Sequence, residues 1–342
     1  HRIADFRMDI HYLCENQYMW VENEFGSRRR MTKEEAEKLD PSRGKIFYPS
    51  DLASSGYTPT CTFAFPFENK TIPAAKKSWR THPDGINRLI ATGRIMTIGD
   101  KDRPCFVQYH EDNPSQIINN FWDDTRSEMD KQYVVQTATS IIERCLLMTT
   151  EPGDLVLDPT CGSGTTAYVA EMWGRRWIST DTSSVAIAIA RQRLLSATYN
   201  FFRLRDEKKG VAGNFKYKKV PHIELQDIAN NDRLDPIFEK HEPELARALE
   251  NCNKLLPVIT ENLRSKLEAK LAEKLNAGGK RAITDADERR WNLPKKSAKW
   301  QHWDVPFDMD PDWPKQLQEA VSTYRNAWRR RMDEVNRCIE SG

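Results

Sequence analysis

The sequence predicts an α/β protein whose central part is a doubly wound parallel sheet. Short strands and helices alternate between residues 121 and 215, a glycine-rich loop joins one strand to the next helix, and an acidic residue ends the following strand. Alternation at this spacing is typical of parallel sheets covered by helices. Residues 1–120 predict a mixed α+β region before this sheet, and residues 216–342 predict a charged helical extension after it.

The N-terminal region, residues 1–120, is irregular, aromatic and rich in proline and glycine. Segments with β propensity, such as Cys61–Phe67 and Ile95–Ile98, lie between dense turn signals. Ile86–Thr92 predicts a short helix that ends at Gly93, because a glycine after the last periodic residue is a common helix stop. We therefore expect many short elements in this region.

The central region begins with a predicted helix at Thr139–Thr149, where apolar residues recur at helical spacing. Leu155–Leu157 predicts a fully buried strand of the parallel type, because all three residues are apolar. The next predicted elements are a helix, a strand and a helix: Thr165–Trp173, Trp177–Thr180 and Ser183–Ser196. Strands and helices in this order predict the doubly wound sheet.

The C-terminal region is predicted to be mainly helical. Leu245, Leu249 and Leu256 mark one amphipathic helix, and a second extends from Ile259 to Leu275. After a tryptophan-rich connector, Leu317–Ile339 predicts a last helix. No heptad pattern persists, so packing within the chain is favoured over a coiled coil. The Trp328–Arg331 cluster on this helix is interpreted as a solvated face, with a DNA contact as the alternative.

Composition excludes several classes of protein. No apolar run approaches the roughly 20 residues that cross a bilayer, so we expect no membrane partner. The seven cysteines include no CxxC pair, which argues against a zinc ribbon and favours reduced thiols in the cytosol. The 52 basic and 50 acidic residues give a formal charge of +2, which is compatible with DNA binding but does not predict it.

The most informative segment follows the Leu155–Leu157 strand and is Asp158-Pro-Thr-Cys-Gly-Ser-Gly-Thr-Thr166. Gly162 and Gly164 permit positive φ angles and let a ligand lie against the backbone. The helix N-terminus beyond them offers free N–H groups. Asp181 ends the second strand, where a carboxylate can accept both hydroxyls of a ribose. The segment predicts a site for an adenosine-bearing cofactor at the carboxyl edge of the sheet.

The glycine pattern leaves two cofactors open. Gly162-Ser-Gly-Thr-Thr-Ala167 also satisfies the dinucleotide fingerprint, so an NAD-dependent oxidoreductase is an alternative. In that fingerprint the first glycine follows the strand almost directly, whereas here four residues intervene. Asp158 would then face the phosphates. A carboxylate at the strand end instead suits the cationic amino group of a methionine moiety.

The same segment resembles the cofactor motif Asp-Pro-x-x-Gly-Ser-Gly-Thr-Thr of the β-class amino-methyltransferases, which methylate adenine N6 or cytosine N4 in DNA. Residues 131–137 and Pro152-Gly153-Asp154 resemble the stretch before that motif. Within the class, Tyr133–Leu195 is most similar to methylation subunits of type III restriction–modification systems. The resemblance implies a Rossmann-like fold that uses S-adenosyl-L-methionine, in a cytoplasmic prokaryotic protein that needs no metal.

The resemblance also implies roles for particular residues. Asp158 and the glycine loop would surround the methionine moiety, Asp181 would hold the ribose, and Thr137 would close the other side. Cys161 stands where the family often has phenylalanine, and a small apolar filler is favoured over a nucleophile because no His–carboxylate pair lies nearby. The implied cofactor-binding set is Thr137, Asp158, Pro159, Cys161, Gly162, Ser163, Gly164, Thr165, Thr166 and Asp181.

The family's second motif, Asp/Asn/Ser-Pro-Pro-aromatic, does not occur in this sequence, so the catalytic residues are unknown. The nearest segment, Asp310-Pro-Asp-Trp313, departs at the second proline and is expected to cap the last helix. In the β class this motif precedes the cofactor motif. We therefore expect a fragment, with the catalytic half upstream of His1 or on a separate chain and residues 1–120 as the target-recognition region. Similar proteins also extend beyond the position of Gly342.

The implied partner is double-stranded DNA, with a restriction subunit or a second methyltransferase chain as a possible further partner. Candidate DNA contacts are Lys76, Lys77, Trp79 and Arg80, because cations meet phosphates and tryptophan can stack or wedge. Arg28–Arg30 is a second candidate cluster, and an ordinary solvated surface is the alternative for both. The leading hypothesis is a DNA methyltransferase for which adenine N6 is favoured over cytosine N4 as the target. The alternative is a non-catalytic cofactor-binding or DNA-recognition subunit.

Overall fold

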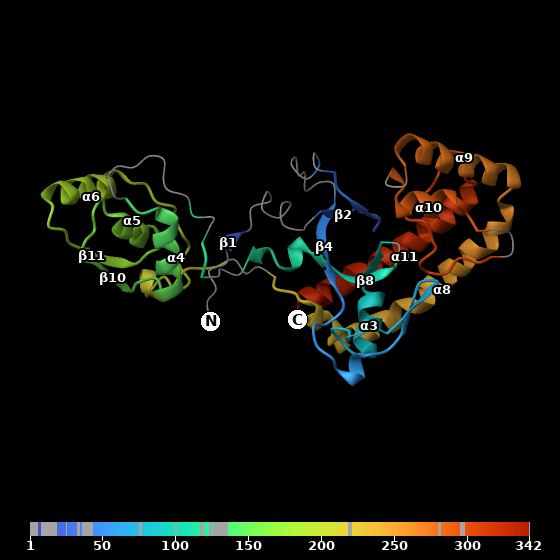
Figure 1. Ribbon diagram of the computed structural model, residues 1–342, viewed down its shortest axis with the longest axis horizontal. Coiled ribbons are helices and arrows are strands. Elements are labelled where there is room, and N and C mark those ends of the chain that lie inside the picture. The colour runs from blue at the N-terminus through green and yellow to red at the C-terminus, as the bar shows by residue number, and fades with distance from the viewer. Residues whose placement is uncertain are drawn as a thin grey trace. The chain divides into compact units, whose positions relative to one another are not determined.

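The chain forms two compact units (Figure 1). Each unit has its own apolar core. The first unit contains His1–Arg7 and Ser115–Val220, and the second contains Met8–Pro114 and Pro221–Gly342. No helix among the residues that the structure describes is long and apolar enough to cross a membrane. The computed structural model describes residues 6–7, 19–24, 26–32, 35, 44–74, 77–99, 101–116, 120–122, 125, 136–217, 221–279, 282–294 and 298–341.

A parallel strand pair forms the centre of the first unit. In this pair, β10 (Leu155–Asp158) lies beside β11 (Arg176–Ser179), with Asp158 opposite Ser179. The helices α4 (Thr139–Thr149), α5 (Thr165–Met172) and α6 (Ser184–Ser196) agree with the predicted helices to within a residue. A short antiparallel pair joins β1 (Phe6–Arg7) to β9 (Ser115–Gln116). The predicted strand–helix–strand unit is confirmed, and the larger doubly wound sheet stays a prediction.

Among the described residues, helices cover one face of this strand pair and leave the other exposed. Val156 packs with Leu146 of α4 and with Val169 of α5. Leu155 and Leu157 point to the opposite face and are 53% and 66% exposed. The prediction of a fully buried strand is therefore wrong for these two leucines. Successive side chains of a strand point to opposite faces, and the described helices pack against one of them.

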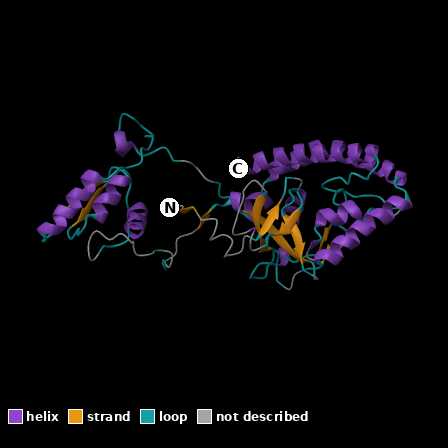
Figure 2. Ribbon diagram, turned by 90° about the horizontal axis from the view of Figure 1, so that it is seen from above, coloured by secondary structure: helices purple, strands orange, loops and turns teal. Residues whose placement is uncertain are grey.

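The second unit contains an antiparallel sheet, whose strands are orange in Figure 2. The sheet has five strands in the order β3-β2-β4-β8-β7. Its strands are β2 (Trp20–Glu22), β3 (Arg28–Arg30), β4 (Lys45–Asp51), β7 (Ile95–Ile98) and β8 (Arg103–Tyr109). A separate hairpin pairs β5 (Phe65–Phe67) with β6 (Lys70–Ile72). The mixed region of short elements that the sequence predicts is confirmed here.

The predicted short helix of this region is α3 (Pro83–Ala91), which begins one turn earlier than expected. His82 caps its N-terminus, because the ring Nδ1 accepts a hydrogen bond from the backbone N–H of Gly85 at 3.2 Å. Pro83 follows at the first helical position, where its missing N–H is harmless. Gly93 has a φ of 67°, which explains why the helix ends there.

Five further helices of different lengths are described in the second unit. They are α7 (Leu225–Ala229), α8 (Asp235–Leu255), α9 (Glu261–Gly278), α10 (Asp285–Trp291) and α11 (Lys315–Glu340). Short 3-10 turns of this unit lie at Pro59–Cys61, His110–Asp112, Asp232–Leu234 and Leu256–Val258, and a further one, Gly210–Gly213, belongs to the first unit. The helix α11 packs against α8 (Figure 1), with Val321 and Tyr324 buried against Leu245. The predicted amphipathic helices are confirmed.

The N-terminal region and the C-terminal helices share one core. Leu52, Trp79 and Ile86 pack in the same cluster as Ile228 of α7 and Val335 of α11. A buried ion pair, in which the Arg94 Nη2 atom lies 3.0 Å from the Asp112 Oδ1 atom, lies in the N-terminal part of this unit. The two regions that the sequence separates at residues 120 and 216 thus fold around common apolar residues.

Candidate functional site

The loop between β10 and α5 uses two glycines in the left-handed region. Gly162 has a φ of 49° and Gly164 a φ of 77°, which L-residues with a side chain rarely adopt. Gly164 is also closely packed, because a Cβ atom there would lie 2.8 Å from the Cβ atom of Ala190 in α6. Glycine is therefore required at position 164 both by the backbone and by the approach of α6.

Asp181 holds the loop from the end of β11. Its Oδ2 atom accepts a hydrogen bond from the backbone N–H of Gly162, and its Oδ1 atom accepts one from the N–H of Ser183, each at 2.8 Å. These backbone donors, Ser183 first, lower the pKa of the Asp181 carboxyl group. Asp181 is thus an ionised acceptor beside the loop. A carboxylate has about four lone-pair positions, so acceptor capacity remains for a ligand hydroxyl.

The rest of the loop is also tied to the strand ends. The Asp158 Oδ1 atom accepts the N–H of Thr160 at 3.1 Å. The Cys161 N–H donates to the Thr180 carbonyl at 2.9 Å, and the Thr180 hydroxyl donates to the Pro159 carbonyl at 3.0 Å. These bonds bring Asp158, Pro159 and Cys161 together with Asp181 at the carboxyl edge of the strand pair, where the sequence predicts the cofactor.

Cys161 behaves as a packed thiol. It is buried, and burial, with smaller contributions from Asp181 and Asp158, raises the pKa of its thiol. A raised pKa disfavours the nucleophilic thiolate and supports the interpretation as a small apolar filler.

The predicted residues at the helix start differ in exposure. Ser163 and Thr165 are buried, and the Thr165 Oγ1 atom accepts a hydrogen bond from the Arg193 Nη1 atom at 3.0 Å. Thr166 is half-buried. Thr137 is exposed and lies two residues before α4, and no hydrogen bond links it to the loop among the described residues. The structure thus joins Asp181 to the loop by a hydrogen bond, whereas none joins Thr137 to it in the described part of the chain.

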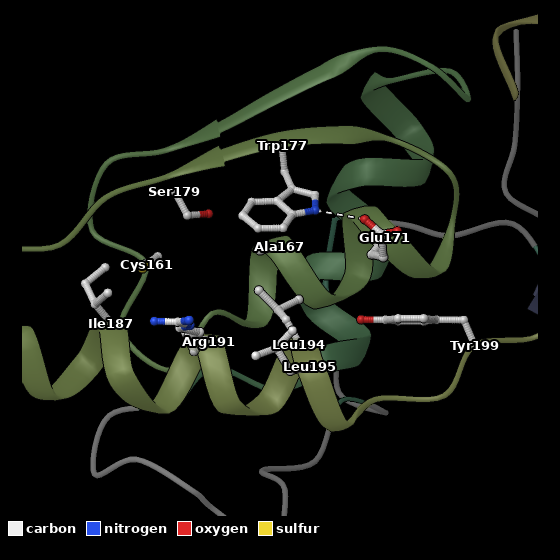
Figure 3. A pocket seen from close by; sticks show the side chains of 11 residues that line it. Cys161, Ala167, Glu171, Trp177, Ser179, Ile187, Arg191, Leu194, Leu195 and Tyr199 are labelled. Carbon is white, nitrogen blue, oxygen red and sulfur yellow. Dashed lines mark hydrogen bonds between the residues drawn. The ribbon is translucent and has the colours of Figure 1, made fainter.

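A cavity of about 430 Å³ lies beside the loop, between β11, α5 and α6 (Figure 3). Of the predicted cofactor residues, only Cys161 lines it. Trp177 and Ser179 point into it from β11, and the Trp177 Nε1 atom donates to the Glu171 Oε2 atom at 2.9 Å. The Ser179 hydroxyl is buried without a hydrogen-bond partner in the described part of the chain. Sequence reasoning missed this pair, although residues two apart on a strand share a face.

The predicted DNA-contact cluster separates into exposed and buried residues. Lys77 and Arg80 are exposed, and the Arg80 Nη1 atom lies 3.0 Å from the Ser50 hydroxyl. Trp79 is 5% exposed, and its Nε1 atom donates to the Phe63 carbonyl at 2.7 Å. The prediction that Trp79 stacks on DNA is therefore corrected, because its ring belongs to the core. Lys76 lies outside the described residues.

Two of the three arginines in the second basic cluster, Arg28–Arg30, form ion pairs. Arg28 pairs with Glu22 at 2.6 Å, and Arg29 pairs with Glu35 at 2.7 Å. The hydrogen bond from Arg29 lowers the pKa of Glu35 to about 2. Only Arg30 of β3 is exposed. Two of the three arginines thus support the fold of the second unit.

The segment nearest to a catalytic motif has a structural role. Asp310 is buried and accepts hydrogen bonds from Lys270 at 2.8 Å and from the Trp291 Nε1 atom at 2.7 Å. Lys270 also pairs with Asp312 at 2.6 Å. The expectation that this segment caps the last helix is wrong. The N-cap of α11 is Pro314, which has no side chain able to accept a hydrogen bond, so no side-chain cap forms.

The comparisons with known proteins all point to DNA methyltransferases. A family model described as DNA methylase matches residues 15–192, more than half of the chain. The type II methyltransferase M.EcaI of Enterobacter cloacae is 28% identical over 36% of this chain and 28% of its own length. M2.DpnII of Streptococcus pneumoniae is 31% identical over 36% of this chain and 48% of its own length.

The DNA adenine methyltransferase YhdJ of Escherichia coli strain K12 is 34% identical over 30% of this chain and 36% of its own length. The chain thus spans less than half of the length of each of these three relatives. Two of them are named type II methyltransferases, and the expected likeness to type III subunits stays a prediction.

Proposed function

Since this chain belongs to the DNA methylase family, we propose that it serves methyl transfer from S-adenosyl-L-methionine to an exocyclic amino group of a DNA base. The single observation that carries this proposal is the hydrogen bond from the Gly162 N–H to Asp181, which holds the glycine loop against an ionised acceptor. One relative is named a DNA adenine methyltransferase, which supports adenine N6 over cytosine N4. The setting would be the prokaryotic cytoplasm.

The polar groups around the loop fit a nucleoside that carries a methionine moiety. The two side chains at the strand ends, Asp158 and Asp181, are both acidic, which suits a cationic amino group and ribose hydroxyls. The N–H groups of Thr160, Cys161, Gly162 and Gly164 already donate within the protein. A pyrophosphate at this loop would therefore meet carboxylates and few free donors, which disfavours the dinucleotide alternative.

The proposed role of this chain in catalysis is to position the cofactor. The cofactor supplies an activated methyl group on a sulfonium when it is bound. Asp181 would orient the ribose through its remaining acceptor positions, and Asp158 would orient the amino group of the methionine moiety. Holding two reactants in a reactive geometry removes an entropic barrier worth roughly 7–11 kcal/mol. The loop hydrogen bonds supply the rigidity that such positioning needs.

The exposed face of the strand pair supports a larger sheet. Leu155, Leu157 and Ile178 are all at least half exposed on one face. Apolar residues on both faces of a parallel strand are typical of sheets that are covered on both sides. We propose that β10 and β11 belong to a doubly wound sheet whose further elements cover this face and carry the Pro-Pro-aromatic motif.

A second candidate function rests on the same face. If the covering elements belong to another chain, this protein is the cofactor-binding and DNA-recognition subunit of a multi-chain methyltransferase, with or without a restriction subunit. Lys77 and Arg80 are then the proposed phosphate contacts on double-stranded DNA, because both are exposed cations. Methyl transfer to DNA by this chain alone would support the first candidate, and methyl transfer only after addition of a second chain would support the second.

The proposal is tested by calorimetric titration of S-adenosylhomocysteine and of NADH into the chain. We expect saturable binding of S-adenosylhomocysteine alone. Asp181→Ala should weaken it about tenfold to a hundredfold, which is the loss of a charge-assisted hydrogen bond. Asp206→Ala is the matched control, because Asp206 lies in the same unit and accepts the N–H of Lys208. Binding of NADH without binding of S-adenosylhomocysteine would refute the proposal.

A further inference from the structure

A second cavity, of about 540 Å³, lies within the second unit. It lies where the C-terminal end of α3 and the strands β2 and β3 meet one face of α11. Ligand sites are typically concavities of about 300–1,000 Å³. Its volume therefore suits a ligand of the size of one nucleotide.

Arg325 of α11 lines this cavity as a buried cation that forms no ion pair with a carboxylate of the described residues, and Asp285 acts on it only through longer-range charge. The residue is 7% exposed. Its Nε atom donates to the Pro306 carbonyl at 2.7 Å, its Nη2 atom donates to the Val305 carbonyl, and its Nη1 atom has no hydrogen-bond partner among the described residues. Burial lowers the pKa of Arg325 to about 10. A buried charge without a counter-ion is costly, which favours an anion at this position.

Arg331, six residues further along α11, lines the same cavity. Its Nε atom is buried without a hydrogen-bond partner in the described part of the chain, while its Nη2 atom donates to the Ala91 carbonyl. Burial lowers the pKa of Arg331, and Tyr324 and Glu242 oppose this only through longer-range charge. No carboxylate of the described residues forms an ion pair with either arginine, so the two present unbalanced positive charge.

The other charged groups of the cavity are already balanced. Arg28 pairs with Glu22, and Arg289 pairs with Asp285 at 2.9 Å and with Glu68 at 3.5 Å. Burial lowers the pKa of His302, which keeps its ring neutral near pH 7. The surplus charge of the cavity therefore comes from Arg325 and Arg331.

Aromatic rings line the cavity beside these arginines. The guanidinium groups of Arg289 and Arg325 each lie 4.5 Å from the centre of the Phe307 ring. Trp328 lies one helical turn after Arg325 and also lines the cavity. Planar bases stack on such rings and on guanidinium planes, worth about 1–3 kcal/mol per base. The combination of rings and unpaired cations matches a ligand that is planar at one end and anionic at the other.

We propose that this cavity binds a nucleotide, with the phosphate at Arg325 and Arg331 and the base against Trp328. The ligand is either a free nucleotide or one nucleotide unit of a DNA strand. All the residues named belong to the second unit, and none belongs to the glycine loop. The proposal can therefore fail while the proposed methyltransferase function stands, and the reverse also holds.

The test is calorimetric titration of 5′-dTMP and of thymidine into the full chain. The pyrimidine avoids confusion with a site for an adenosine-bearing cofactor. We expect saturable binding of 5′-dTMP and at least tenfold weaker binding of thymidine, because the nucleoside lacks the phosphate. Equal affinity for the two, or no saturable binding of 5′-dTMP at millimolar concentration, would overturn the proposal.

Variants locate the site. Arg325→Met should weaken 5′-dTMP binding at least tenfold, whereas Arg330→Met should not, because Arg330 is an exposed arginine of the same helix that pairs with Glu244. Ala91→Phe fills the cavity without changing its charge and should also abolish binding. Asp181→Ala should leave 5′-dTMP binding unchanged. Unaltered affinity in Ala91→Phe, with melting curves confirming that the variant is folded, would place the ligand elsewhere and overturn the proposal.

Competition then distinguishes the two sources of the nucleotide. If a five-nucleotide oligothymidylate displaces 5′-dTMP from the wild-type chain, and binds the Ala91→Phe variant at least tenfold more weakly than the wild type, the ligand is a unit of a DNA strand. If 5′-dTMP binds and the oligonucleotide does not displace it, the site takes a free nucleotide. Either result supports a nucleotide site in this cavity.

Discussion

The backbone N–H of Gly162 donates a hydrogen bond to the Oδ2 atom of Asp181, 2.8 Å away and 19 residues further along the chain. This bond joins the glycine loop after β10 to the end of β11. The same carboxylate accepts the N–H of Ser183, the N-cap residue of α6. One acidic side chain therefore organises the loop and the start of α6, which is why its removal should disturb any ligand bound there.

Gly164→Ala should destabilise the first unit by about 1–3 kcal/mol, because the new Cβ atom meets Ala190 in a packed core. Gly210→Ala is the matched control. Gly210 also has a positive φ, 58°, but its Cβ atom would meet nothing within 4 Å, so only backbone strain is added. Urea denaturation measures both. Equal losses in the two variants would show that the approach of α6 is not the cause, and Ala190→Gly should rescue Gly164→Ala in part.

Asp112→Ala should destabilise the second unit by about 3–5 kcal/mol, because it leaves Arg94 as an uncompensated buried charge. Glu111→Ala, one residue away, removes a partner of the exposed Lys45 and should cost at most about 1 kcal/mol. Chemical denaturation of both variants gives the comparison. Replacing both residues of the buried pair with apolar ones should cost less than Asp112→Ala alone, and a larger loss in the double variant would contradict this account.

Asp287→Asn should remove stability that depends on pH. Burial alone would raise the pKa of Asp287, but hydrogen bonds from Lys274 and Thr284 outweigh burial and lower it. A carboxyl group whose pKa is lowered by folding stabilises the protein above its unfolded pKa of about 3.9 and loses this effect as the pH falls through the folded value. The difference in unfolding free energy between wild type and variant should therefore be full at pH 7 and shrink below about pH 4. A difference that stays constant from pH 7 to pH 3 would exclude this cause.

Leu157→Ser should change the stability of the chain by no more than about 0.5 kcal/mol, because the side chain is 66% exposed. Val156→Ala, the neighbouring change on the covered face, should cost about 0.5–1.5 kcal/mol or more, as methyl groups are lost from a packed core. Thermal unfolding of the two variants checks this contrast. If the wild-type chain self-associates through the exposed face, Leu157→Ser should also reduce that association in sedimentation experiments.

Trp79→Ala should destabilise the second unit by about 3–5 kcal/mol, because a large ring leaves the core. Lys77→Ala and Arg80→Ala should change the free energy of unfolding by no more than about 0.5 kcal/mol.

If Lys77 and Arg80 contact phosphates, each substitution should weaken DNA binding similarly for all sequences and lower its salt dependence by about one charge. A sequence-selective loss would instead indicate contact with bases.

The local elements could be predicted because their signals lie within a few residues. Thr139–Thr149 is a helix at the predicted bounds. The helix α3 ends at Ala91, two residues before Gly93, whose positive φ is incompatible with a continuing helix. The interpretation of the Trp328–Arg331 cluster as a solvated face is correct for Arg330, which is 62% exposed, but wrong for Trp328 and Arg331, which line a cavity. Helical spacing alone does not say how far an opposing element covers a face.

The sequence by itself determined the glycine loop, the strand–helix order around it and the acidic residue at the end of β11, because backbone conformation and hydrogen bonding there depend on near neighbours. Only the tertiary structure decided that Trp79 is core, that Leu157 is exposed and that Arg325 is buried. Burial depends on residues far away in the chain, such as Ile228 beside Trp79 in one cluster. No local pattern encodes which distant surface packs against a side chain.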